Sequence, residues 1–323
     1  MSFKDLLGKQ MLFFDGATGT QLQARGLQAG ELPERWNFTH PEIIEAVHKD
    51  YLVAGANILK TNTFGANPIK LAETDLDCKA TITAAVTIAK KACAGAIDKF
   101  VALDLGPTGK LLAPYGDLPF EKAVAAYGEM VRYGVEAGAD LILIETMSDT
   151  YETKAAILGA KENCDLPVCV TLTFDEDGKL LTGATVEAAA LMCEGLGVDA
   201  IGFNCGLGPV QVAKLVPQML QATKLPLIVN PNAGLPVQRD GKTCFDITPE
   251  EYAGLMYALA YVDAPSIMGG CCGTTPAHIA AMITKCKNLQ PGGTRELDLT
   301  AVSSYGKAVH IGDVPVIIGE RIN

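Results

Sequence analysis

The sequence is poor in positive charge. Its 26 lysines and arginines stand against 37 aspartates and glutamates, which gives a formal net charge of −11. Nucleic acids and anionic membrane surfaces are bound through basic patches, so this balance argues against both as partners. No apolar run approaches the roughly 20 residues of a membrane-spanning helix. The apolar stretch at residues 11–14 is too short for a secretory signal, so we expect a cytoplasmic protein.

Motifs for common cofactors and for disulfide frameworks are also missing. No Gly-x-Gly-x-x-Gly pattern follows the first predicted strand, which argues against a dinucleotide-binding domain. The four histidines are scattered and form no His-x-x-His cluster. Ten cysteines in a chain that we expect in the cytoplasm are unlike a disulfide framework, and seven of them have no ligand-like grouping.

The other three cysteines form the most distinctive pattern. Cys271 and Cys272 are adjacent within GGCCGTTP, residues 269–276, between a short apolar run and a helical pattern. Neighbouring thiols pair with each other only under strain, but both can bind one soft metal ion, most often zinc. Cys205, which follows another apolar run, is the best third ligand, and three protein ligands leave the open position of a catalytic zinc site. The alternative is a packed turn in which the thiols are small apolar side chains.

The order of the apolar runs predicts the fold. Eight short β-rich runs each lead into a turn and an alanine-rich helical pattern: residues 11–14, 57–60, 100–103, 141–144, 168–173, 200–203, 227–229 and 266–268. This alternation predicts an α/β fold, a (β/α)₈ TIM barrel. An open doubly wound sheet is the alternative, but the count of eight and the uniform composition favour the barrel. In a barrel, Cys205 and the cysteine pair meet at one mouth.

The tail departs from this pattern. From residue 291 the helical periodicity stops, residues 303–306 have the composition of a loop, and residues 314–323 have the pattern of a further strand. We therefore expect a barrel of residues 1–290, and a tail of residues 291–323 that is a linker and the start of a following domain. Thr39 and Thr248 stand where the helices that follow them should start.

Polar residues at the ends of the runs indicate a substrate site. Backbone N–H groups of the turn at residues 15–20 could hold a carboxylate, or the segment could be an ordinary strand-to-helix turn. Asp15 and Glu145 could be an acid–base pair, or could hold an ammonium group. Asn62 either lines the mouth or caps a turn. With zinc nearby, an amino acid that carries a thiol fits. The expected substrate contacts are Asp15, Gly16, Ala17, Thr18, Gly19, Thr20, Asn62 and Glu145.

Five motifs in order carry a resemblance to a known family: DGATGT at residues 15–20, TNTF at 61–64, ET at 145–146, GFNC at 202–205 and GGCCGTTP at 269–276. Over about residues 10–288 the chain resembles the zinc-dependent homocysteine S-methyltransferases. It is most similar to the N-terminal homocysteine-binding module of cobalamin-dependent methionine synthase, because residues 316–323 resemble the opening of a folate-binding barrel. The cobalamin-binding signature Asp-x-His-x-x-Gly is absent from the sequence.

The resemblance implies a mechanism. Zinc would be held by Cys205, Cys271 and Cys272, with Asn232 as a resting fourth ligand, and Asp15 and Glu145 would hold the amino group of homocysteine. The zinc-bound homocysteine thiolate would attack a methyl group, expected to be that of methylcobalamin carried by another module, and give methionine. The implied partners are homocysteine and the cobalamin-binding and folate-binding modules.

Two alternatives stay open. One is a stand-alone homocysteine methyltransferase that uses S-methylmethionine, S-adenosylmethionine or betaine. The other is a zinc-thiolate binding or redox-sensing barrel without turnover.

Overall fold

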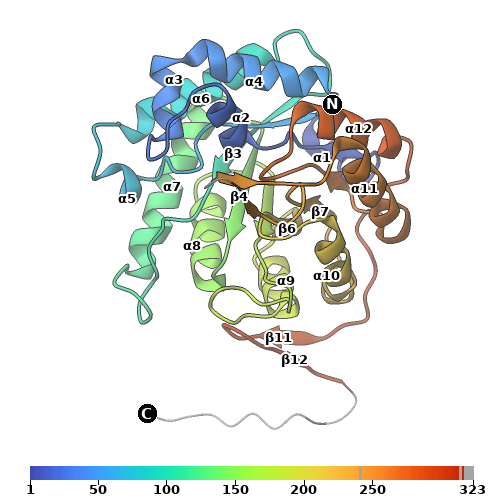
Figure 1. Cartoon of the computed structure of the whole chain (residues 1–323). Coiled ribbons are helices and arrows are strands. Elements are labelled where there is room, and N and C mark those ends of the chain that lie inside the picture. The colour runs from blue at the N-terminus through green and yellow to red at the C-terminus, as the bar shows by residue number, and fades with distance from the viewer. Residues whose placement is uncertain (240–241, 313–314, 316–323) are drawn as a thin grey trace.

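A computed structural model describes residues 1–239, 242–312 and 315, and its centre is a ring of eight parallel strands (Figure 1). Along the ring the order is β1-β10-β7-β6-β5-β4-β3-β2, and a bridge between Phe14 and Ile58 joins the two ends. The predicted (β/α)₈ barrel is thereby confirmed. The strands are β1 (Leu12–Phe13), β2 (Ile58–Lys60), β3 (Phe100–Leu105), β4 (Leu141–Met147), β5 (Val168–Leu172), β6 (Ala200–Asn204), β7 (Leu227–Asn230) and β10 (Ile267–Met268).

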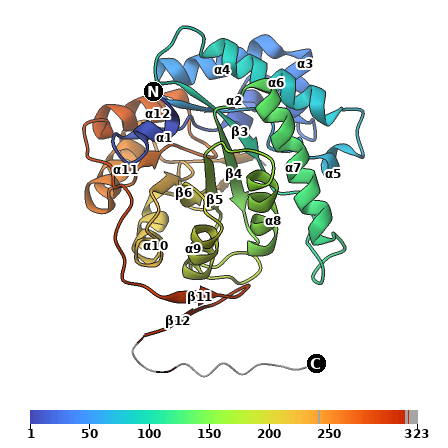
Figure 2. The same cartoon turned by 180° about the vertical axis from the view of Figure 1, so that it is seen from behind.

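A helix follows each strand and covers the outside of the ring (Figures 1 and 2). In chain order these helices are α4 (Pro41–Val53), α6 (Cys78–Ala92), α7 (Phe120–Ala137), α8 (Thr150–Lys161), α9 (Val186–Gly195), α10 (Pro209–Ala222), α11 (Pro249–Asp263) and α12 (Pro276–Cys286). Because side chains alternate along a strand, one set faces the helices and the other fills the barrel. Leu141 and Leu143 belong to the inner set, and Ile142 between them packs with the outer core.

The predicted helix starts are partly correct. Thr248 is the N-cap of α11, and its side chain and that of Glu251 form a reciprocal capping box. The helix expected after Thr39 does begin at Pro41, but Thr39 is not its N-cap. His40 is the N-cap of α4, and Thr39 instead closes the short helix α3 (Trp36–Thr39), whose four residues are too few to give a readable period.

Short elements that were not predicted line the barrel mouth or lie close to it. After β1 come α2 (Thr18–Ala24) and the 3₁₀ turn η1 (Pro33–Arg35), and α5 (Pro68–Leu71) follows β2. The segment between β7 and α11 contains a hairpin of β8 (Val237–Arg239) and β9 (Lys242–Cys244). At the opposite end, α1 (Phe3–Leu6) closes the barrel, and Phe3 packs edge-to-face on Phe100 at 5.8 Å between ring centroids.

The tail, as far as residue 312, packs against the barrel. The backbone N–H of Arg295 donates to the carbonyl of Lys224 at 2.9 Å. Beyond it, β11 (Ala301–Ser303) and β12 (Ala308–His310) form a hairpin beside α9, and the carbonyl of Tyr305 accepts from Thr150 Oγ1 at 2.7 Å (Figure 1). The predicted strand at residues 314–323 lies outside the described residues, apart from position 315. Among the described residues no helix is long and apolar enough to cross a membrane.

Candidate functional site

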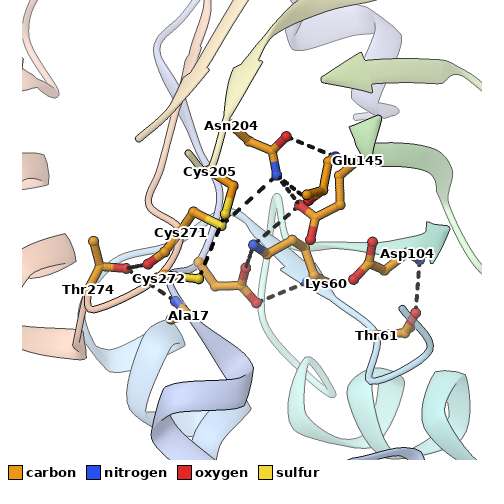
Figure 3. Close-up of polar contacts among 12 residues, drawn as sticks. Ala17, Lys60, Thr61, Asp104, Glu145, Asn204, Cys205, Cys271, Cys272 and Thr274 are labelled. Carbon is orange, nitrogen blue, oxygen red and sulfur yellow. Dashed lines mark hydrogen bonds and ion pairs between the residues drawn. The ribbon is translucent and has the colours of Figure 1, made fainter. Parts of the chain in front are cut away.

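Three thiols gather at the C-terminal end of the barrel. Cys205 follows β6, and Cys271 and Cys272 lie in the turn between β10 and α12. All three Sγ atoms lie within 4.8 Å of one another, and those of Cys205 and Cys272 are 3.8 Å apart (Figure 3). Cys205 has a φ of +56°, a left-handed conformation that non-glycine residues adopt only at a cost.

The spacing of the thiols fits a tetrahedral soft-metal site. Zinc–sulfur bonds of about 2.3 Å at tetrahedral angles put two sulfurs roughly 3.8 Å apart. Hydrogen bonding with Cys271 lowers the pKa of Cys205, but hydrogen bonding with Cys272 and burial outweigh it and raise the pKa to about 11. Thiols crowded in this way resist ionisation unless a cation joins them. The donor set and its spacing therefore fit zinc.

Glycine and threonine determine the shape of the cysteine turn. A Cβ on Gly270 would lie 2.5 Å from Thr274 Oγ1, so a larger residue does not fit there. Thr274 Oγ1 donates to the carbonyl of Cys271 at 2.7 Å and accepts from the N–H of Ala17 at 3.1 Å. This hydroxyl therefore links the cysteine turn to the glycine-rich turn after β1, two motifs at opposite ends of the sequence.

The thiols line a cavity of about 610 Å³ at the barrel mouth. The lining residues are Ala17, Thr18, Gly19, Thr20, Leu32, Pro33, Glu34, Lys60, Thr61, Asn62, Phe64, Gly65, Lys70, Leu71, Asp104, Glu145, Thr146, Cys205, Cys271 and Cys272. No residue after Cys272 contributes to the wall in the described part of the chain. The cavity is therefore built by the barrel alone.

Lys60, at the end of β2, is the centre of a buried charge cluster. Its Nζ lies 3.5 Å from Glu145 Oε2 and 3.8 Å from Asp15 Oδ1, and its backbone N–H donates to Asp15 Oδ2 at 2.9 Å (Figure 3). Burial alone would lower the pKa of Lys60, but the carboxylates of Glu145 and Asp15 hold it well above its usual value. Sequence analysis missed Lys60, because a lysine at the end of an apolar run looks like a residue that reaches solvent.

Asp15 and Glu145 differ in their access to the cavity. Asp15 is fully buried and is absent from the lining, and burial raises its pKa to about 7 despite the opposing charge of Lys60. Glu145 lines the cavity. Asn204 Nδ2 approaches Glu145 Oε2 at 3.5 Å and Cys271 Sγ at 4.0 Å, and Asn204 Oδ1 accepts from the N–H of Thr146. Asn204 thus connects the acid to the thiols.

The other predicted contacts are placed as follows. Ala17, Thr18, Gly19 and Thr20 line the cavity. Gly16 lies beneath them, where a Cβ would meet Thr274 Oγ1 at 2.6 Å.

Two asparagines have different predicted roles, Asn62 as a substrate contact and Asn232 as a fourth zinc ligand. Asn62 lines the cavity, and its Nδ2 holds the mouth segment by donating to Pro33 O and Asn37 Oδ1. Asn232 is buried and is not among the lining residues. Its Oδ1 has no hydrogen-bond partner among the described residues, which leaves this atom available as a ligand.

Comparisons with known proteins identify a family and two curated relatives. A family model described as homocysteine S-methyltransferase matches residues 12–286. Methionine synthase of Mycobacterium leprae is 33% identical over 346 residues, and that of Mycobacterium tuberculosis is 33% identical over 341 residues. Each alignment covers 99% of this chain but only 28% of the relative, so the chain spans little more than a quarter of their length.

Solved structures agree with these relatives. The oxidized form of the homocysteine methyltransferase MmuM from Escherichia coli superposes with a TM-score of 0.71 at 27% identity, covering 88% of this chain and 98% of that one. Its metallated form gives a TM-score of 0.69 at 28% identity, covering 85% and 96%. Since the family model spans the whole barrel, including all three cysteines, the chain belongs to the homocysteine S-methyltransferase family.

Proposed function

We propose that this chain is a zinc-dependent homocysteine S-methyltransferase. The observation that carries the proposal is the group of three thiols that lines a cavity beside a buried acidic cluster. Cys205, Cys271 and Cys272 would hold the zinc, with Asn232 as the resting fourth ligand. A zinc ion held there would lower the pKa of a bound thiol, so that the thiol is present as a thiolate at neutral pH.

The chain's own residues orient the substrate. The carboxylate of Glu145 accepts hydrogen bonds from the ammonium group of homocysteine. Asp15 contributes indirectly, because its negative charge offsets that of Lys60 and keeps this lysine in place. The carboxylate is placed toward residues 17–20, where the first N–H groups of α2 have no partner within the helix. The homocysteine sulfur then attacks the methyl carbon. A carbon–sulfur bond forms, the bond from the methyl group to its donor breaks, and methionine results.

We propose methylcobalamin, carried by another module, as the methyl donor. Support comes from the methionine synthases that this chain resembles, which are more than three times its length. Residues 1–290 would then be the homocysteine-binding module. Residues 291–323 would lead to a folate-binding module, and a cobalamin-binding module would be the other partner.

A stand-alone homocysteine methyltransferase is the second candidate. The observation that favours it is the likeness to MmuM, because the barrel of this chain covers 98% of that protein. Its donor would be S-methylmethionine, S-adenosylmethionine or betaine.

A donor comparison separates the two candidates. The zinc-loaded chain is incubated with homocysteine and either free methylcobalamin or one of the three small donors, and methionine is measured. Slow transfer from methylcobalamin alone is expected, because the missing module would supply only proximity. Ready transfer from a sulfonium or betaine donor would favour the stand-alone enzyme. No methionine with any donor would leave a binding barrel without turnover.

Binding heats test the state of the substrate. The free thiol is mostly protonated at pH 7, with a pKa of about 8.5, so binding as a thiolate must release a proton. Binding heats measured in buffers of different ionisation enthalpy should therefore differ in proportion to that enthalpy. Methionine has no thiol proton and should show no such effect. A homocysteine binding heat that is independent of the buffer would contradict binding as a thiolate.

A further inference from the structure

Among the described residues, the carboxylate of Asp104 has no hydrogen-bond or ion-pair partner. Asp104 is the penultimate residue of β3, near the barrel mouth. Its side chain is 5% exposed and lines the cavity. Its backbone is held on both sides, since its N–H donates to Thr61 Oγ1 at 3.0 Å and its carbonyl accepts from Thr63 Oγ1 at 2.7 Å. In the described part of the chain no hydrogen bond or ion pair involves the Asp104 carboxylate, and its Oδ1 is a buried acceptor without a donor.

Such a group needs an external partner. A buried carboxylate without a donor costs free energy unless a ligand supplies one. Burial, and next the charge of Glu145, raise the pKa of Asp104 well above its usual value despite the opposing charge of Lys60, so a cation bound between the two acids would stabilise both carboxylates. Figure 3 shows Asp104 on the side of Lys60 that faces away from the cysteines.

The other charged side chains near Asp104 already have contacts inside the protein. Lys60 lies 3.8 Å from Asp15 and 3.5 Å from Glu145, and Asp15 does not reach the cavity. Of the two other charged groups on the wall, Glu34 accepts from the N–H of Gly65 at 2.6 Å, and Lys70 Nζ lies over the Phe64 ring at 5.5 Å. Three acids around one lysine leave negative charge unmatched, and on the cavity wall that charge belongs to Glu145 and Asp104.

We infer that Asp104 is a recognition residue that binds the ammonium group of the amino-acid substrate together with Glu145. This inference rests on the proposed function and deepens it, because it adds Asp104 as the second ammonium contact, the role that the sequence analysis expected of Asp15. Asp15 lies behind Lys60 and keeps that lysine in place. The thiol end of the substrate then faces the cysteines, and its amino end lies beyond Lys60.

The test compares two ligands that differ only in the amino group. Homocysteine and 4-mercaptobutanoate are titrated into the zinc-loaded full chain, and the ratio of their dissociation constants is the readout. Asp104→Asn should weaken homocysteine binding by roughly 10- to 100-fold, the range for a lost charged hydrogen bond, and should leave 4-mercaptobutanoate nearly unchanged. Asp104→Glu keeps the negative charge, so it should restore part of the preference for homocysteine over 4-mercaptobutanoate that Asp104→Asn loses.

Controls separate recognition from folding. Glu152→Gln removes a carboxylate that is as buried as that of Asp104, at 5% exposure, but that already accepts from Thr108 and lies outside the cavity lining, so it should leave the ratio unchanged. Zinc content and melting temperature report whether each variant is folded, and Asp104→Ser provides a second loss variant that cannot overpack the wall. An unchanged ratio in both folded loss variants would overturn the inference. Failure of the unmodified chain to bind homocysteine at all would instead count against the proposed function.

Discussion

Sγ of Cys205 and Sγ of Cys272 lie 3.8 Å apart although 67 positions separate them in the sequence. Their strands, β6 and β10, are separated around the ring only by β7, so barrel closure itself brings the thiols together. The proximity of the thiols therefore follows from the order of the strands in the fold.

Metal content should depend on each of the three cysteines. The protein should hold about one zinc per chain, and Cys205→Ser, Cys271→Ser or Cys272→Ser should each lose most of it, because two thiolates bind zinc far more weakly than three. Cys193→Ser, at a fully buried cysteine of α9 outside the thiol cluster, is the control and should keep its metal. Metal analysis after dialysis gives the result, and full retention in the Cys271→Ser and Cys272→Ser variants would refute the assignment.

Glu145 should discriminate for the amino group. Glu145→Gln should weaken homocysteine binding by about 1–3 kcal/mol, the range for hydrogen bonds to charged groups. Binding of 4-mercaptobutanoate, which lacks the amino group, should change much less. Calorimetric titration of both ligands measures this, and equal losses for the two would show that Glu145 does not contact the ammonium.

Lys60 and Asp15 should be energetically coupled. Lys60→Met leaves buried carboxylates without their cation and should cost about 3–5 kcal/mol of unfolding free energy. Adding Asp15→Asn should recover a large part, because the uncompensated charge is removed as well. Urea unfolding of the single and double variants forms a double-mutant cycle, and additive losses would mean that the pair does not interact.

His48 should make the protein acid-sensitive. This side chain of α4 is fully buried, and burial lowers its pKa to about 4, below the value near 6.5 that it has in the unfolded chain. The unfolded chain therefore binds more protons between these values. The stability from neutral His48 is fully present above about pH 6.5 and is lost as the pH falls through about 4.

A comparison with His48→Leu isolates this effect. Relative to the variant, the unmodified chain should lose up to about 3 kcal/mol of unfolding free energy between pH 6.5 and pH 4. Denaturant unfolding at several pH values measures the difference. Parallel curves for the two proteins over this window would argue against a buried neutral histidine.

The tail should be dispensable for the site. A chain that ends at residue 290 should keep zinc and homocysteine affinity, because no described residue after Cys272 lines the cavity. It should unfold at a lower temperature, since the contacts of Arg295 and Tyr305 are lost. Loss of zinc binding in this shorter chain would show that the tail belongs to the barrel and that the boundary at residue 290 is wrong.

The barrel could be predicted because each of its units repeats a local signal. Apolar runs and alanine-rich helices alternate eight times. The cysteine cluster followed from the fold, because strand ends converge at one mouth. The hairpin β8–β9 and the short helix α3 were missed, since three or four residues carry no period.

The charge cluster could not be read from the sequence. Lys60 pairs with Asp15 and Glu145 only after the strands have assembled. The lack of a donor to Asp104 Oδ1 likewise appears only in the folded chain. Asn62, which was expected to contact substrate, does line the cavity, but its Nδ2 already donates to Pro33 O and Asn37 Oδ1, which only the structure reveals. Sequence motifs identify which residues reach the mouth, and three-dimensional packing decides which of them are still free to bind a ligand.

The left-handed backbone at Cys205 sets function against stability. A side chain in that conformation costs roughly 1 kcal/mol or more compared with glycine. The chain tolerates this cost because it directs the thiol toward Cys272. Replacement by glycine should therefore give a protein that melts higher than the serine or alanine variant while losing the ligand. Selection for stability alone would favour glycine at this position. The cysteine therefore costs the fold stability in exchange for a proposed metal ligand.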